Sequence, residues 1–207
     1  MSDLVFYTNP MSRGRIVRWM LEEVGIPYET VVVDYAAMGA PDYRAVNPMA
    51  KVPAIRHGDT TVTECAAICC YLAEVFPEAG LTPPPGTVER GAFLRWMFFG
   101  AGPVEAAVTN LSFGWAAGTP QEEARLGYGS SARVLDTLEA LVAAGPYLLG
   151  ERFSAVDVYL GSQIAWGLQF GTMEARPGFE DYVGRVMSRP AAQSASARDD
   201  ALMPARD

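Results

Sequence analysis

The sequence predicts an α/β domain followed by an all-helical domain. Strand-like and helical segments alternate over the first 75 residues, a pattern typical of an α/β unit. The stretch PEAGLTPPPGTV, residues 77–88, is rich in proline and glycine and reads as a linker. Beyond it, apolar residues recur at helical spacing. We therefore expect a first domain at 1–77, a linker at 78–88 and a helical domain at 89–207.

The first domain has the pattern of four strands and two helices. Gly25 and Pro27 end the first helix, and the β-branched run YETVVVDY favours a strand. Strands joined through a helix are parallel and hairpin strands are antiparallel, so we expect a mixed four-stranded sheet. In order, the expected elements are a strand at 4–7, a helix at about 12–24, a strand at 28–35, two strands flanking the turn HGD, and a helix at 66–76.

The second domain shows no strand-like alternation. A helix at 89–112 is expected to bend near Gly100–Pro103, since glycine and proline weaken a helix interior. The segment 154–170 is apolar nearly all round and predicts a buried central helix. Helical patterns also cover 120–144 and 178–190, and the polar tail at 191–207 predicts weak helix or disorder.

Composition excludes several functional classes. The net charge of −8 and the absence of a basic run argue against a nucleic-acid partner. No apolar stretch is long enough to span a bilayer, and the N-terminus lacks a signal peptide, so we expect a cytoplasmic protein. Three cysteines within six residues and a single histidine predict neither disulfides nor a metal site. We expect the cysteines to be buried and His57 to be exposed at the hairpin tip without a function.

The stretch NPMAKVPAIRHGDTTVTEC suggests a peptide-binding site. Proline is excluded from strand interiors, so Pro53 should begin a strand, and a cis bond from Val52 would turn the Val52 backbone outward to pair with an extended peptide. Glu64 and Cys65 precede a helix, whose free N–H groups favour a carboxylate. Glu64 could meet an ammonium group, and Lys51 a second carboxylate.

Three segments resemble the glutathione transferases. VPAI…TECAAICCYLAE resembles the glutathione-binding half of these enzymes, and SRGRIVRWMLEEVGIPYE is similar to the first helix and second strand of bacterial members. RFSAVDVYL resembles the family's F-[ST]-x-x-D segment, in which Ser154 would cap the central helix and Asp157 would complete a capping box. The resemblance covers essentially the whole chain and implies a thioredoxin-like first domain.

The resemblance implies that the peptide is glutathione, used as a co-substrate, with no metal and no tightly bound cofactor. Val52 would pair with the cysteinyl backbone, and Lys51 would approach the glycine carboxylate. Cys65 stands where the family usually has serine, and a thiol is the weaker donor, so we expect weaker binding. The implied glutathione-binding residues are Arg13, Lys51, Val52, Pro53, Glu64 and Cys65.

The thiol must be activated, because the thiolate is the nucleophile. YTNPMSRGR offers Tyr7, Asn9 and Ser12, of which Ser12 is the first choice and Tyr7 the second. Ser12 is the expected N-cap of the first helix and matches the catalytic position of bacterial and theta-like members. Arg13 and Arg15 follow where the helix dipole disfavours cations, which suggests a bound anion. There is no cysteine at position 12 for glutaredoxin-like chemistry.

A hydrophobic second substrate would meet the thiol between the two domains. The expected wall consists of Met11, Phe113, Trp115, Trp166 and Phe170. The expected activity is transfer of the glutathione sulfur to a hydrophobic electrophile, or reduction of a peroxide. The alternative is a non-catalytic binding or regulatory protein on the same scaffold. The resemblance also implies a two-fold homodimer, with the surface around Phe98 and Phe99 as a candidate interface.

Overall fold

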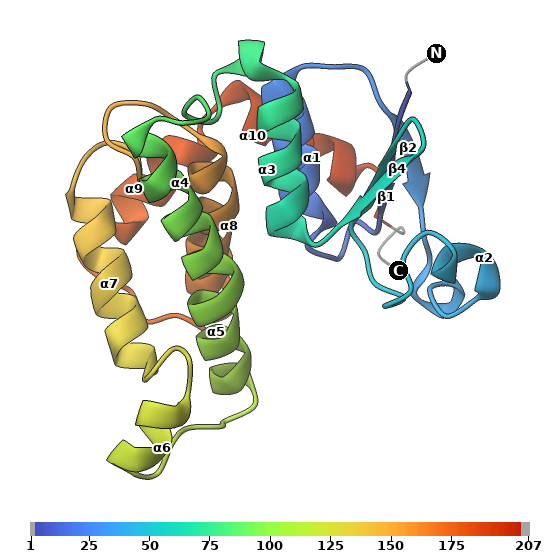
Figure 1. The fold of residues 1–207 in the computed structure, drawn as a ribbon. Helices are drawn as coiled ribbons and strands as arrows, with labels where there is room; N and C mark the ends of the chain where they lie inside the picture. Colours follow the sequence, from blue (N-terminus) through green and yellow to red (C-terminus); the bar gives the residue numbers. More distant parts are fainter. Residues whose placement is uncertain (1–2, 204–207) are drawn as a thin grey trace. The chain divides into compact units, whose positions relative to one another are not determined.

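The computed structural model describes residues 3–203, which form two compact units (Figure 1). The first unit contains the described residues up to Gly80, together with those from Ser188 onward. The second unit is Leu81–Met187. The change of unit after Gly80 falls inside the expected linker. The chain returns to the first unit at Ser188, however, whereas the expected helical domain continued to residue 207.

A four-stranded mixed sheet forms the centre of the first unit. The strands run in the order β2-β1-β3-β4. β1 pairs in parallel with β2, where Val5 faces Glu29, and antiparallel with β3, where Phe6 faces Ile55. This confirms the predicted mixed sheet. The strands are β1 (Leu4–Thr8), β2 (Glu29–Val32), β3 (Ala54–His57) and β4 (Thr60–Thr63).

Three longer helices accompany this sheet. α1 is strongly amphipathic, and Ile16, Met20 and Leu21 on its apolar face are fully or almost fully buried. Its end is set by Gly25, whose left-handed conformation lets the N–H of that residue donate to the Leu21 carbonyl at 2.9 Å. The helices of this unit are α1 (Gly14–Val24), α3 (Cys65–Val75) and α10 (Pro190–Asp200), with the short elements η1 (Tyr35–Ala37), α2 (Pro41–Arg44) and η2 (Pro77–Ala79).

The polar tail is more ordered than expected, because α10 packs against α1. Arg18 donates to Asp199 at 2.7 Å with both side chains buried, and Arg189 forms a two-armed contact with Glu23. An Ala- and Ser-rich helix has little apolar surface to bury. Ion pairs with α1 therefore provide the tertiary contacts that stabilise α10. Residues 204–207 of the predicted tail lie outside the described residues.

In the second unit, the first expected helix contains an irregular turn and the next expected helix is divided in two. α4 (Val88–Phe99) continues through a π-helical turn, η3 (Gly100–Val104), into α5 (Glu105–Ser112), so the helix is irregular at the Gly100–Pro103 segment where a bend was expected. The expected segment 120–144 is divided into α6 (Pro120–Arg125) and α7 (Ser131–Ala143). It breaks there because Gly129 has a left-handed φ of 71° and Ser130 caps the second helix by accepting from the Arg133 N–H.

α8 (Ala155–Phe170) is the central helix of the second unit, and α9 (Phe179–Met187) packs beside it. The predicted capping box at Ser154 is present. The buried Asp157 carboxylate accepts from the Ser154 N–H and hydroxyl, the Leu148 N–H and the Tyr182 hydroxyl at 2.8–3.1 Å. Burial raises the pKa of Asp157, and these four hydrogen bonds oppose that shift.

The remaining sequence expectations have mixed outcomes. Cys65 and Cys69 are buried free thiols, whereas Cys70 is half-buried. His57 is not exposed at a hairpin tip, because its Nδ1 lies 2.9 Å from the Tyr71 hydroxyl and its ring packs against Phe76. Within residues 3–203 there is no cluster of side chains suited to a metal ion and no helix long and apolar enough to cross a membrane.

The capping network of α8 generates a stability prediction. Ser154→Ala should lower the free energy of unfolding by about 1 kcal/mol, as expected for a lost cap. Asp157→Ala should cost about 3 kcal/mol or more, because several buried donors lose their acceptor together. Urea unfolding of the two variants beside the wild type measures both values. Equal losses would show that the Asp157 contacts do not support α8 beyond its cap.

Candidate functional site

The loop between β1 and α1 is fixed by side-chain hydrogen bonds. Asn9 donates from Nδ2 to the Val33 carbonyl at 3.1 Å and accepts the Met11 N–H at 3.0 Å. The Tyr35 hydroxyl donates to the Met11 carbonyl at 2.9 Å. Asn9, one of three candidates for thiol activation, is therefore buried and engaged in holding the loop.

Ser12 lies one residue before the N-cap of α1. Its hydroxyl donates to the Asn9 carbonyl at 2.7 Å and accepts the Gly14 N–H at 3.0 Å. The expectation that Ser12 is the N-cap was wrong by one residue, since Arg13 holds that position. The hydroxyl nevertheless satisfies one N–H at the start of the helix, as a capping side chain does.

Gly14 lets α1 begin directly against the end of β1. A Cβ at this position would overlap Thr8 Oγ1 and would lie 3.0 Å from Ser12 Oγ. The close approach therefore requires glycine here, and it holds the Ser12 hydroxyl near the first turn of the helix.

The start of α3 is open. Among the described residues, the backbone N–H groups of Cys65, Ala66 and Ala67 have no hydrogen-bond partner. Glu64, before them, is exposed and has a left-handed φ of 65°, which is uncommon for a residue with a Cβ. Free N–H groups and the positive end of the helix dipole favour a bound carboxylate at this point.

The two helix starts are directly connected. The Cys65 thiol donates to the Arg13 carbonyl at 3.8 Å, which places the first turn of α3 beside the Ser12 loop. The thiol is thus engaged with the loop, and the Cys65 side chain is only 9% exposed. Cys65 also hydrogen-bonds Cys69, which together with burial raises the pKa of Cys69. The backbone of Cys65, not its thiol, remains for a ligand.

The segment before β3 presents its backbone as predicted. The Val52–Pro53 bond is cis, Pro53 is buried, and in the described part of the chain the Val52 N–H and carbonyl have no hydrogen-bond partner. The Lys51 carbonyl accepts from the Tyr43 hydroxyl and from Asn47 Nδ2, both at 2.7 Å. These two contacts anchor the segment from the side of α2.

Lys51 and Glu64 are both exposed, and neither forms an ion pair with another described residue. Arg13 is exposed as well. Charged groups of both signs therefore surround the Ser12 loop, the start of α3 and Val52.

Tyr7 lies on the other face of β1. Side chains alternate along a strand, and Phe6 faces α1, with the Arg18 guanidinium 5.1 Å from its ring centre. Tyr7 instead packs with Tyr43, at 6.1 Å between ring centres, and with the cluster around Val33. Tyr7 thus points away from the face of the sheet that α1 covers, and Val52 packs against the same cluster as Tyr7.

The predicted apolar wall is distributed over both units. Met11, in the first unit, is 56% exposed. In the second unit, Phe113 and Trp115 stack at 5.1 Å between ring centres, each 64% exposed. Trp166 is half-buried and Phe170 is 68% exposed, one turn apart on α8. Their role as a shared wall stays a prediction.

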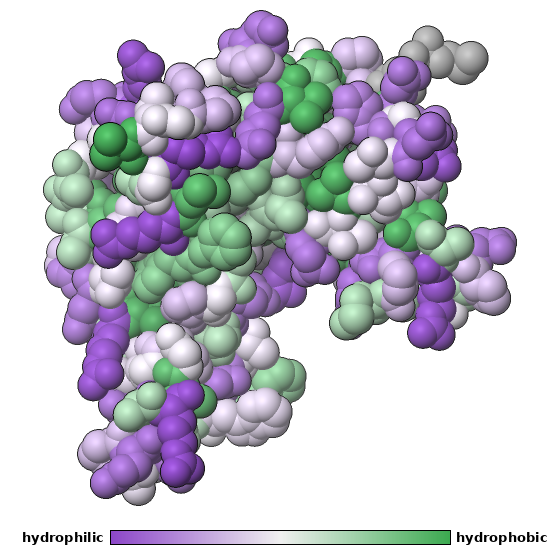
Figure 2. Space-filling view, in the orientation of Figure 1, coloured by the Kyte–Doolittle hydropathy of each residue, from purple (hydrophilic) through white to green (hydrophobic). Residues whose placement is uncertain are grey.

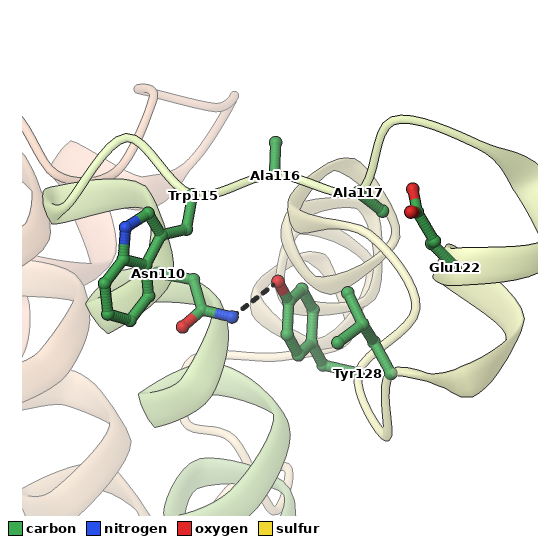
Figure 3. A pocket seen from close by; sticks show the side chains of 7 residues that line it. Asn110, Trp115, Ala116, Ala117, Glu122 and Tyr128 are labelled. Carbon is green, nitrogen blue, oxygen red and sulfur yellow. Dashed lines mark hydrogen bonds between the residues drawn. The ribbon is translucent and has the colours of Figure 1, made fainter.

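A shallow pocket of about 210 Å³ adjoins Trp115 (Figure 3). Asn110 donates from Nδ2 to the Tyr128 hydroxyl at 2.9 Å on one side, and Ala116 and Ala117 lie on another. Leu126 and the Glu122 carboxylate complete the lining, so the pocket is about as polar as it is apolar.

Apolar side chains also gather on the surface over α4 and α5 (Figure 2). Val88, Leu94 and Phe98 of α4 are exposed, Phe98 by 72%. Phe99 is less exposed and packs edge-on against Trp96. This surface contains the candidate dimer interface.

Comparisons with known proteins agree with this geometry. Residues 11–75 match the family described as glutathione S-transferase, N-terminal domain, and residues 121–185 match its C-terminal domain. Glutathione S-transferase F10 of Arabidopsis thaliana is 32% identical over 147 residues, 67% of this chain and 68% of that protein. The chain belongs to the glutathione S-transferase family. The family resemblance and the enzyme class predicted from the sequence are thereby confirmed.

Solved structures of the family share the fold along almost the whole chain. A glutathione transferase from Methylococcus capsulatus str. bath is 31% identical, with a TM-score of 0.77 covering 96% of this chain and 99% of that one. A sphingomonad glutathione S-transferase, solved in complex with glutathione, is 27% identical, with a TM-score of 0.77 covering 95% and 98%.

Sequence reasoning found the residues around the opening of α3 but missed those that hold the loops. Tyr35, Tyr43 and Asn47 fix the loops through single hydrogen bonds to backbone carbonyls. Such contacts follow no spacing rule. Only the Asn-Pro pair at 47–48 carried a signal, since it favours a turn.

The Tyr43 contact predicts a pH dependence of stability. Burial, with a smaller effect of Tyr7, raises the pKa of Tyr43 to about 12. The unfolded chain releases this proton first, near a pH of about 10, so stability is complete below that pH and falls as the pH rises toward about 12. Tyr43→Phe should flatten this alkaline loss in urea unfolding series measured from neutral to alkaline pH. Parallel curves for the two proteins would contradict it.

Proposed function

We propose that this protein activates the thiol of glutathione with Ser12 and transfers the sulfur to a hydrophobic electrophile. The observation that supports the proposal is the Cys65–Arg13 contact, which joins the loop that carries Ser12 to the start of α3 with its unpaired N–H groups. A hydroxyl donor and a carboxylate-binding helix start are the two groups that a thiol-containing γ-glutamyl peptide needs.

Glutathione fits the groups around this opening. Its γ-glutamyl carboxylate would accept from the N–H groups of Cys65 and Ala66, and the exposed Glu64 would meet the ammonium group. The free backbone of Val52 would pair with the cysteinyl residue in the manner of an added strand. Arg13 and Lys51 supply positive charge for the glycine carboxylate. The glutathione complex of the sphingomonad relative supports this assignment.

Activation requires the Ser12 hydroxyl to turn from the Asn9 carbonyl toward the thiolate. The Asn9 carbonyl keeps the Ser12 N–H, at 3.1 Å, so it is not left unpaired. The exchanged hydrogen bond costs about 1 kcal/mol, which a bond to a charged sulfur offsets. The Gly14 N–H, still donating to Oγ, polarises the hydroxyl and so strengthens it as a donor.

The thiolate then attacks an electrophilic carbon. A carbon–sulfur bond forms, and the leaving group departs with the bonding electron pair, so no redox partner is needed. The exposed Met11, in the same loop as Ser12, would contact the hydrophobic substrate. Peroxide reduction at the same thiolate is a second possible use, in which two glutathione molecules become a disulfide while the peroxide is reduced.

A non-catalytic binding protein on the same scaffold is the alternative function. It would keep glutathione or another partner at the α3 opening without lowering the thiol pKa. The homodimer, through the exposed surface around Phe98, and the cytoplasmic location stay predictions from the sequence.

Replacement of Ser12 tests the proposed activation. Ser12→Ala should bind glutathione with nearly unchanged affinity, raise the pKa of the bound thiol and lower kcat by about 100-fold, within the range for loss of one transition-state hydrogen-bond donor. Thiolate absorbance, calorimetry and steady-state rates with an aromatic halide measure the three quantities. Tyr7→Phe is the matched control, since it removes the competing hydroxyl.

The Tyr7→Phe variant also shows which result would contradict the role of Ser12. A raised thiol pKa in Tyr7→Phe with no change in Ser12→Ala would transfer the role to Tyr7. A wild type that binds glutathione without lowering its thiol pKa would favour the non-catalytic alternative.

Position 65 offers a test of the glutathione contact. In Cys65→Ser, the hydroxyl would turn from the Arg13 carbonyl, which the thiol contacts, to the γ-glutamyl carboxylate. The variant should then bind glutathione about fivefold more tightly, since a hydroxyl is a stronger donor than a thiol and one hydrogen bond contributes about 1 kcal/mol. Cys65→Ala should leave the affinity near that of the wild type, because the backbone N–H persists. Calorimetric titration compares the three proteins. A large loss of binding in Cys65→Ala would show that the thiol itself holds the ligand.

A further inference from the structure

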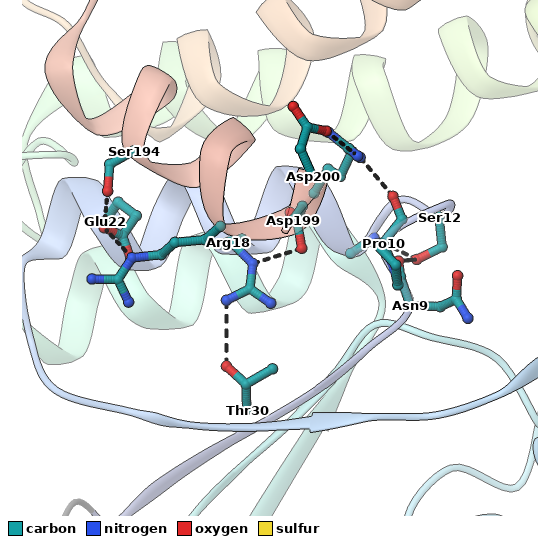
Figure 4. A network of polar contacts seen from close by, with 12 residues as sticks. Asn9, Pro10, Ser12, Arg18, Glu22, Thr30, Ser194, Asp199 and Asp200 are labelled. Carbon is teal, nitrogen blue, oxygen red and sulfur yellow. Dashed lines mark hydrogen bonds and ion pairs between the residues drawn. The ribbon is translucent and has the colours of Figure 1, made fainter. Parts of the chain in front are cut away.

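Arg15 joins the Ser12 loop to α10. Figure 4 shows its two partners, Pro10 of the loop and Asp200 of α10. The Arg15 Nε donates to the Pro10 carbonyl at 2.6 Å, and its Nη2 contacts Asp200 Oδ1 at 2.7 Å. One guanidinium thus holds a loop carbonyl with one arm and a carboxylate of α10 with another. The cation at the start of α1, which suggested a bound anion from sequence alone, has its anion in Asp200.

The Pro10 carbonyl lies in the turn that carries Ser12, so a shift of this carbonyl would also shift the Ser12 hydroxyl. The preceding carbonyl, that of Asn9, accepts both the Ser12 N–H and the Ser12 hydroxyl. Pro10 therefore belongs to the tight turn that presents the hydroxyl. The loop is also fixed by Asn9 to Val33 and by Tyr35 to Met11, so Arg15 is the contact that ties it to α10.

The docking of α10 does not depend on Asp200. The neighbouring Asp199 is buried and pairs with Arg18 of α1. Arg189, directly before α10, donates two hydrogen bonds at 2.7 Å to Glu23 of α1. Asp200 is itself 64% exposed. A side chain so placed adds little to the folded state, because exposed ion pairs contribute little to stability. Its contact instead fixes the conformation of the Arg15 side chain.

We propose that Asp200 is a positioning residue for the transferase reaction, acting through Arg15 to hold the Ser12 hydroxyl where it meets the thiol. This role rests on the proposed function of Ser12. Without Asp200, the Arg15 side chain regains rotamer freedom and its hydrogen bond to Pro10 is less often formed. The effect then appears in thiol activation, while the glutathione contacts at α3 and Val52 are unchanged.

The test compares Asp200→Ala with Arg198→Ala. Each variant removes an exposed side chain of α10 that pairs with α1, since Arg198 contacts Glu22 at 3.4 Å. Within the described residues, however, Glu22 has no hydrogen bond or ion pair to the Ser12 loop. Asp200→Ala should lower kcat about fivefold, the upper end of what an exposed ion pair contributes, and raise the pKa of the bound thiol. The glutathione Kd should stay unchanged, and Arg198→Ala should resemble the wild type in all three.

Two further variants separate positioning from folding. Asp200→Glu, which keeps the carboxylate, should restore much of kcat and of the lowered thiol pKa. Arg15→Ala should reduce kcat, and adding Asp200→Ala to it should cause no further loss, because the two act along one path. Urea midpoints of Asp200→Ala and Arg198→Ala should agree with each other.

The outcomes are distinguishable. Equal kcat and thiol pKa in Asp200→Ala and Arg198→Ala, with a lowered thiol pKa in the wild type, would overturn the role of Asp200 alone. Additive losses in the Arg15 and Asp200 double variant would overturn it as well. A wild type without a lowered thiol pKa would overturn the proposed function of Ser12, and with it the positioning role.

Discussion

The candidate site depends on the close approach of α1 to the end of β1. At Gly14 there is no room for a Cβ beside Thr8, so the chain must turn within the few residues from Asn9 to Arg13. That tight turn brings the Ser12 hydroxyl to the first turn of α1 and aims the Arg13 carbonyl at Cys65. The start of α3 thereby contacts the loop that carries the hydroxyl, and the proposed chemistry uses these two features together.

Near this turn, the backbone N–H groups at the start of α1 have hydrogen-bond partners, whereas, within residues 3–203, those at the start of α3 do not. The first N–H groups of α1 are satisfied by the loop itself, for example Gly14 by Ser12 and Ile16 by Arg13. The first N–H groups of α3 have no such partners among the described residues. Two neighbouring helix starts therefore have different uses. One presents a side chain, and the other presents a binding surface for an anion.

Much of this could be predicted from the sequence, and the limits have physical causes. Alternating patterns, Gly25 as a helix end and Pro53 before a strand are local signals, so the mixed sheet and the unpaired Val52 backbone were predictable. The packing of α10 was not, because Arg18–Asp199 joins residues far apart in the chain and the helix has almost no apolar pattern. His57 was misjudged because it is half-buried by contacts with Tyr71 and Phe76, which lie outside its own hairpin.

The central claim is that Ser12, not Tyr7, meets the sulfur of glutathione, and a crystal structure of the glutathione complex tests it most directly. The account predicts the sulfur within about 3.5 Å of Ser12 Oγ, a donor distance suited to sulfur. It also predicts the γ-glutamyl carboxylate on the N–H groups of Cys65 and Ala66. A sulfur beside the Tyr7 hydroxyl, or a glutathione that leaves the start of α3 empty, would contradict the account.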